Sequence, residues 1–156
     1  KMDRDPGTRI MIIGSVNTDR EFVGMVENQC DLPATIVIDD TCTGIRYNFN
    51  DVNPADDRLM AISLRYNHRP PCPNKDWPRR RRIPFIKHLM KAYNVEAVIL
   101  FNHKFCQPHQ LDNAVIEREL KAMDIPQLTL EFDIRIPIGQ FRTRVEAMLE
   151  TTMDII

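Results

Sequence analysis

A cysteine flanked by two histidines is the segment of this chain best suited to chemistry. Cys106 lies midway between His103 and His109. The apolar run 97–101 predicts a short buried strand, and a helical pattern opens near Pro108. A thiol between a strand end and a helix start lies where open α/β sheets build their sites, and the helix dipole there favours the metal-binding thiolate. Cys106 is therefore a candidate metal ligand; the alternative is a free structural cysteine.

Other side chains could complete a metal site with Cys106. A zinc site would use His103, Cys106 and His109, with Cys42 and Cys72 as additions. The spacing lacks the paired Cys-x-x-Cys unit that makes a zinc site convincing. Iron–sulfur clusters prefer thiolates, and one or two from this chain are too few to hold one. The local spacing alone therefore leaves the identity of the metal open.

A second candidate segment follows a predicted strand at 35–38. It spans residues 39–47 and contains Cys42, which could be a second metal ligand or part of the wall of the same pocket. The alternative is a plain loop in which an aspartate caps a turn and Gly44 supplies a positive φ. The irregular stretch 42–54 is long for a connection, and long connections are typically functional.

Alternating strand and helix patterns predict the fold class. We expect an α/β domain with an open parallel four-stranded sheet in the order 2-1-3-4, and with helices on both faces. The predicted strands are 9–15, 35–38, 97–101 and 128–132. A helix that begins at Pro54 would bury Leu59, Ile62 and Tyr66. The residues that follow each strand should share one edge of the sheet.

Composition and charge exclude several classes of function. The net charge of −1 over 156 residues gives no reason to propose a nucleic acid as partner. We see no apolar run of membrane-spanning length and no signal peptide. Four widely spaced cysteines lack the density of a secreted disulfide scaffold and favour a reducing, cytoplasmic setting. We expect Cys30, at the end of an amphipathic helix, to lie in the core.

Two arginine-rich segments are candidate anion sites. The run 79–82 could be a solvated face, or it could hold the phosphates of a cofactor, with Trp77 stacking on an adenine. Segment 139–144 opens the last helix and could hold an anion through its backbone N–H groups and Arg142 and Arg144. Two arginines at a helix start oppose the macrodipole, so we expect a compensating partner nearby.

Several motifs, in order along the chain, resemble the carboxyl-terminal domain of the benzoyl-CoA reductase and 2-hydroxyacyl-CoA dehydratase family. The resemblance spans roughly residues 9–150. Its Cys-Thr-Gly-x-Arg-Tyr form favours the aromatic acyl-CoA (benzoyl-CoA type) reductase branch over the dehydratase branch. The motifs lie at 40–47, 69–73, 105–109, 131–133 and 139–147.

The resemblance implies an anaerobic, cluster-bearing enzyme of two related subunits. Such enzymes hold [4Fe-4S] clusters beside a coenzyme A thioester, and a separate ATP-hydrolysing iron–sulfur activator supplies an electron at low potential. The dehydratases expel a hydroxyl through a ketyl radical, whereas the reductases dearomatise a ring. The chain would then be a single α/β domain, 1–156, that forms the carboxyl-terminal part of a longer subunit. The alternative class is a noncatalytic α/β module, possibly zinc-stabilised, that binds a partner or a nucleotide.

The same resemblance implies roles for individual residues. Cys106 matches the cluster ligand that this domain supplies, and Cys42 is a second candidate ligand, while the remaining ligands come from an amino-terminal domain outside this chain. His109 could donate a proton, or it could cap the helix or hydrogen-bond a cluster sulfur. The candidate substrate-binding residues are Arg46, Gln140 and Arg142.

Overall fold

Four parallel strands form one sheet in the order β2-β1-β3-β4, as predicted. The computed structural model describes residues 5–54, 56–76 and 78–153. The central strands are almost continuously apolar because both of their faces are covered, as is usual in parallel sheets. The strands are β1 (Thr8–Gly14), β2 (Ala34–Thr41), β3 (Ala97–His103) and β4 (Gln127–Phe132).

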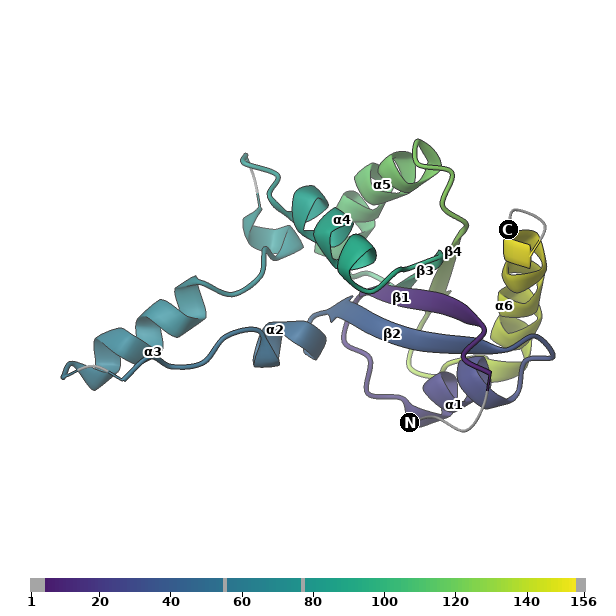
Figure 1. Ribbon diagram of the computed structural model, residues 1–156, viewed down its shortest axis with the longest axis horizontal. Coiled ribbons are helices and arrows are strands. Elements are labelled where there is room, and N and C mark those ends of the chain that lie inside the picture. Colours follow the sequence, from purple (N-terminus) through teal and green to yellow (C-terminus); the bar gives the residue numbers. More distant parts are fainter. Residues whose placement is uncertain (1–4, 55, 77, 154–156) are drawn as a thin grey trace.

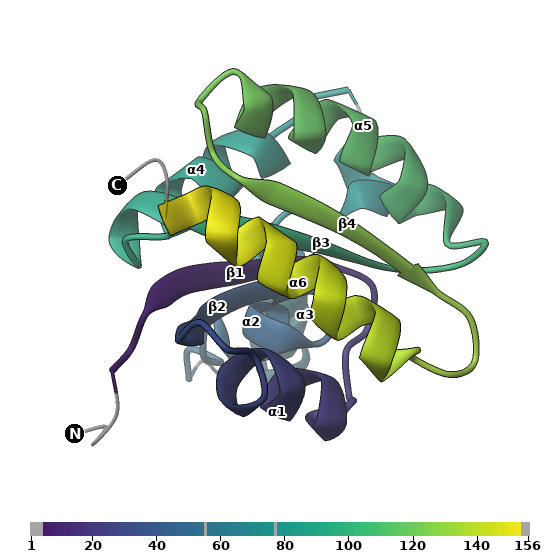
Figure 2. The ribbon, with the colours of Figure 1, turned by 90° about the vertical axis from the view of Figure 1, so that its right-hand side faces the viewer.

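Two pairs of helices cover the two faces of the sheet, so the predicted three-layer arrangement is confirmed (Figures 1 and 2). One face carries α1 (Arg20–Asn28) and α6 (Ile138–Met153), and the other carries α4 (Arg82–Ala92) and α5 (Gln107–Lys121). Alternate residues of β3 enter the two cores, with Ile99 facing α1 and α6. Within the described ranges, no helix is long and apolar enough to cross a bilayer.

Strand β2 extends further than the sequence predicted. The predicted strand ended before Asp39 and Asp40, but both residues lie within β2, which continues to Thr41. Asp40 is fully buried and forms ion pairs with Arg46 and Arg82. A carboxylate that is paired in this way can occupy a strand interior that an unpaired charge could not.

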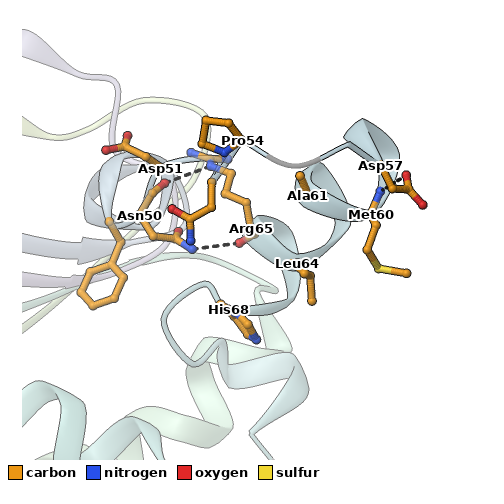
Figure 3. A pocket seen from close by; sticks show the side chains of 11 residues that line it. Asn50, Asp51, Pro54, Asp57, Met60, Ala61, Leu64, Arg65 and His68 are labelled. Carbon is orange, nitrogen blue, oxygen red and sulfur yellow. Dashed lines mark hydrogen bonds between the residues drawn. The ribbon is translucent and has the colours of Figure 1, made fainter.

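The segment between β2 and α4 forms an arm that projects from the sheet (Figure 1). It contains α2 (Gly44–Asn48), α3 (Arg58–Asn67) and the short 3-10 helix Pro73–Lys75, so the stretch predicted to be irregular includes one short helix. A reciprocal pair of hydrogen bonds between Asn50 and Arg65 ties α3 to the loop before it, and Figure 3 shows both bonds at the hollow between them.

The prediction that Leu59, Ile62 and Tyr66 face the core was wrong. Their exposed fractions are 78%, 44% and 55%, and Ala61 is the buried residue of α3. The opposite side of the helix, with Met60, Ala61 and Leu64, lines the hollow (Figure 3). The periodic apolar pattern was therefore identified correctly, but the described part of the chain leaves these side chains exposed.

A pair of leucines tests this assignment of the core. Leu100→Ala should lower the free energy of unfolding of the 156-residue chain by about 2–5 kcal/mol, because the side chain is fully buried against α4 and α5. Leu59→Ala should change it by no more than about 0.5 kcal/mol. Urea unfolding followed by circular dichroism measures both values, and equal losses would contradict the assignment.

Candidate functional site

A tight turn after β3 presents Cys106 at the carboxyl edge of the sheet. Cys106 is the N-cap of α5, is half-buried, and donates its N–H to the carbonyl oxygen of His103 at 3.2 Å. The preceding residue, Phe105, has φ +64° although it is not glycine, and its side chain is 85% exposed. A bulky residue in the left-handed region is strained, and such strain gathers at functional sites. The strained backbone therefore marks the turn that carries Cys106 as a candidate functional feature.

Gly14 and Ser15 fix the end of β3 from the neighbouring strand. Gly14 has φ +144°, and a Cβ atom there would lie 2.0 Å from the carbonyl oxygen of Phe101. This close approach lets the Ser15 N–H donate to the same oxygen at 2.8 Å. The Ser15 hydroxyl then accepts the N–H of His103 at 3.1 Å. Two strand ends are thereby locked together directly below the Cys106 turn.

Cys42 and His109 meet across the same edge of the sheet. The Sγ atom of Cys42 lies 3.2 Å from Nε2 of His109, which is 1% exposed. Burial raises the pKa of the Cys42 thiol, Arg46 opposes that rise, and Cys72 and Cys106 add to it. His109 lies in the first turn of α5, three residues after the N-cap Cys106. The structure therefore places Cys42 against the same helix start that carries Cys106.

Burial also decides the charge state of His109. It lowers the pKa of the imidazole to about 4, with further contributions from Arg82 and Arg46. The ring is therefore neutral near pH 7, which suits a hydrogen bond to sulfur better than it suits proton donation. The predicted proton-donor role stays a prediction, and the hydrogen-bonding alternative agrees with the contact to Cys42.

The zinc triad suggested by spacing does not converge. His103 is exposed, and its ring packs against Phe132, with 4.1 Å between the ring centroids. His109, in contrast, is buried against Cys42. Among the residues that the structure describes, no three His, Cys, Asp or Glu side chains are placed to hold one metal ion. Metal binding at Cys106 would therefore need ligands from beyond the described residues.

A buried network of ion pairs forms the base of the site. Arg82 is fully buried, with Nη2 at 2.9 Å from Oδ2 of Asp40 and Nε at 2.8 Å from Oδ2 of Asp112. Arg46 also pairs with Asp40, at 3.0 Å, and Arg80 pairs with Asp112, at 3.3 Å. Burial raises the pKa of both carboxyls, and the Arg82 charge opposes that rise. The network joins β2, α2, α4 and α5 beneath Cys42 and His109.

The interpretation of the arginine run 79–82 as a solvated face was wrong at one position. Arg79 and Arg81 are exposed and Arg80 is half-buried, but Arg82 is in the interior. The sequence did carry a signal for its partner, because Asp112 lies four residues before Ile116 on the apolar face of α5. Trp77, predicted to stack on an adenine, lies outside the described residues.

Gly44 is required for a different reason from the one predicted. It is not among the described residues with positive φ. A Cβ atom at Gly44 would lie 1.7 Å from Oδ1 of Asp39, and that oxygen accepts the N–H of Ile45 at 2.9 Å. The aspartate does cap the turn, as the plain-loop alternative supposed, and the glycine makes room for its carboxylate.

The three predicted substrate-binding residues lie in different environments. Arg46 is 5% exposed, and its Nε donates to the carbonyl oxygen of Thr41 at 3.1 Å. Gln140 is exposed in the first turn of α6. Arg142 pairs with Glu146 at 2.7 Å and with Asp31 at 3.3 Å, which confirms the expected compensation at this helix start. Their role in substrate binding stays a prediction.

The two remaining cysteines differ in their surroundings. Cys30 is half-buried against the core beside α1 and α6, and burial foremost raises its pKa to about 11. Cys72 is the N-cap of the short 3-10 helix and shares with Cys42 the wall of a cavity of about 400 Å³. Cys72 therefore belongs to the candidate site, whereas Cys30 does not.

The ion-pair network can be tested by removing its centre. Arg82→Met should lower the free energy of unfolding by about 3–5 kcal/mol at pH 7, because two buried carboxylates lose their shared partner. The deficit should shrink as the pH falls towards 5, since the pKa of Asp40 and of Asp112 is raised by burial and protonation removes the buried charge.

Arg79→Met, at an exposed position in the same run, should change stability by at most about 0.5 kcal/mol. Urea unfolding of both variants at the two pH values measures the effect. A deficit in Arg82→Met that grows on acidification would contradict the assignment.

Two comparisons with known proteins bear on this site. The family described as 2-hydroxyglutaryl-CoA dehydratase, D-component, matches residues 1–152. The (R)-phenyllactyl-CoA dehydratase beta subunit of Clostridium sporogenes is 23% identical over 146 residues. That match covers 93% of this chain but 38% of the relative, so the chain spans less than half the length of that protein. The family match extends over all the motifs gathered at the carboxyl edge, and the chain belongs to the 2-hydroxyglutaryl-CoA dehydratase D-component family.

Proposed function

We propose that this chain is the carboxyl-terminal, cluster-bearing domain of a subunit of a 2-hydroxyacyl-CoA dehydratase. The observation that carries the proposal is geometric: Cys42 contacts His109, three residues after the N-cap Cys106, and shares a cavity wall with Cys72, in a chain of this family. The reaction would remove water from a 2-hydroxyacyl-CoA thioester to give the 2-enoyl thioester. The length of the relative supports a longer subunit, of which this domain is one part.

The dehydratase branch is preferred to the predicted reductase branch. The family description and the relative both name dehydratases. The benzoyl-CoA reductase function rested on the form of one motif, around Cys42, and gains no support from either comparison. The relative's name refers to phenyllactyl-CoA, a 2-hydroxyacyl thioester, so we take that class as the substrate.

The residues of the site fit an iron–sulfur cluster that is shared with other parts of the protein. We assign Cys106 as the ligand from this domain, with Cys42 as a second candidate. The arginines beneath the thiols suit the net negative charge of a thiolate-bound cluster. When bound, such a cluster would supply single electrons at low potential. The neutral ring of His109 would hold Cys42 in place and keep water from its sulfur.

The further parts of the proposal concern partners and setting. A second, related subunit and an ATP-hydrolysing iron–sulfur activator would complete the enzyme, and the relative's name as a beta subunit supports the first of these. A reducing, cytoplasmic setting suits the four cysteines, all of which are free thiols. Gln140, exposed at the start of α6, is the candidate substrate-binding residue with no ion pair to break. Arg46 and Arg142 would have to exchange partners to bind a substrate.

The cluster assignment is tested in the complete enzyme, prepared without oxygen. Cys106→Ser should lose most cluster iron and lower the dehydration rate by at least about 100-fold, because a ligand is removed. Cys30→Ser should keep both, since that thiol is half-buried against the core beside α1 and α6, away from the site. Iron, sulfide and zinc content, visible absorption and turnover are measured for each variant.

Full iron content in Cys106→Ser would reject the assignment, and zinc in place of iron would favour the noncatalytic alternative. The branch is decided separately by supplying 2-hydroxyacyl-CoA and benzoyl-CoA thioesters to the unaltered enzyme with its activator and a reductant. Formation of the 2-enoyl thioester supports the proposal, and ring reduction alone contradicts it.

A further inference from the structure

Helix α3 carries a stripe of exposed apolar side chains along one side. Leu59, Ile62 and Tyr66 recur at a spacing of three and four residues, which aligns them along one side of the helix. The other side lines the hollow with Met60 and Leu64, and the Asn50–Arg65 hydrogen bonds tie the helix to the loop before it. A surface helix normally turns such a stripe towards a core, yet the described part of the chain leaves Leu59, Ile62 and Tyr66 78%, 44% and 55% exposed. The pattern favours a contact with a segment other than the described residues.

The stripe leads directly into a positively charged cavity. Tyr66 lies in both, since it also lines the cavity of about 400 Å³ that Cys42 and Cys72 share. The guanidinium carbon of Arg69 lies 3.8 Å from the centroid of the Tyr66 ring. The buried Nε atom of Arg69 has no hydrogen-bond partner among the described residues. An N–H in that position calls for an acceptor from outside.

The charges around this cavity do not balance. Its wall carries Arg46, Arg69 and Arg81 and no carboxylate, and Arg82 lies in the ion-pair network behind it. The buried carboxylates beside these four guanidinium groups are three, those of Asp40, Asp76 and Asp112. The excess is positive. A surface that covers it favourably carries Asp or Glu side chains.

We propose that the stripe of α3 and the arginine-lined cavity form one docking surface for the remainder of the same subunit. This inference rests on the proposed function, in which the other cluster ligands come from that remainder. The matched segment is 38% of the length of the relative, so a subunit of that size has ample chain to cover the arm. The docked segment presents an apolar surface to Leu59, Ile62 and Tyr66 and carboxylates to the arginines. It thereby brings the missing ligands next to Cys42 and Cys106.

The subunit's own chain is the occupant that the proposed function calls for, since it places the other cluster ligands in the remainder of that chain, and the matched segment is 38% of the relative. Cys42 and Cys72 line the very cavity into which the stripe runs, and the described residues place no three donors for one metal ion. A segment that completes a ligand set with Cys42 would lie against this wall, which includes Tyr66. A second subunit or a second copy could cover α3 alone, but neither is required by the site.

Two matched leucines make the test. Leu59 is 78% exposed on α3, and Leu111 is 77% exposed on α5, outside the proposed surface. In the complete subunit, hydrogen–deuterium exchange of the α3 amides should be at least tenfold faster in Leu59→Asp than in the unaltered protein, because a buried charge would lift the docked segment. Leu111→Asp should leave that exchange unchanged. Arg69→Glu, which repels the expected carboxylates, should also speed it.

Preparing the subunit alone and with its partner identifies the occupant. Full protection of α3 in the subunit alone, independent of protein concentration, is the expected result. Protection that appears only when the second subunit is added, or that rises with concentration, would overturn the proposal in favour of that subunit or a second copy. Equal exchange in Leu59→Asp and the unaltered subunit would overturn it outright. None of these readings depends on iron or turnover, so they stay separate from the test of the proposed function.

Discussion

The buried guanidinium of Arg82 is the interaction on which the carboxyl edge of this domain depends. One side chain from the start of α4 bridges Asp40, inside β2, and Asp112, on the buried face of α5. Asp76 anchors the same residue by accepting its backbone N–H at 2.9 Å. Buried ion pairs stabilise a fold less than apolar packing does, so such an arrangement is better understood as fixing geometry. Here the ion pairs fix the position of α4 relative to β2 and α5, whereas apolar contacts alone would let these elements slide past one another.

The chemistry of the edge follows from that constraint. Burial foremost, and then the positive charge beneath the site, lowers the pKa of His109 and so gives a neutral ring against Cys42. The same charge partly opposes the rise in the pKa of the Cys42 thiol. Cys106, on the neighbouring turn, is held by backbone hydrogen bonds and owes its position to β3 and the start of α5. The charged side chains thus set the electrostatic environment of Cys42 and His109, whereas the strained backbone turn sets the position of Cys106.

Sequence periodicity and the rules of parallel crossovers predicted the strand order and the edge at which the cysteines meet. These rules gave wrong predictions at positions where the same residue type can have two different structural roles. Asp40 looked like a strand terminator because its buried partners lie 6 and 42 residues away. Arg82 looked like one more solvated arginine for the same reason. Gly44 was assigned to backbone freedom, because nothing in the local sequence reveals that the Asp39 carboxylate occupies the space of a side chain. Long-range pairing, not local pattern, decided each of these positions.

Phe105 and Gly14 both have positive φ at this edge, but they differ in the substitutions that they can tolerate. Phe105 holds its φ of +64° with its ring in solvent, so glycine or asparagine could stand there and relieve strain without touching a neighbour. Gly14 has no such freedom, because any Cβ atom would collide with the backbone of Phe101. In distant relatives that keep this edge, the position of Gly14 should be fixed while that of Phe105 drifts. The glycine is then the dependable marker for aligning sequences in which the cysteines alone are too sparse to guide the register.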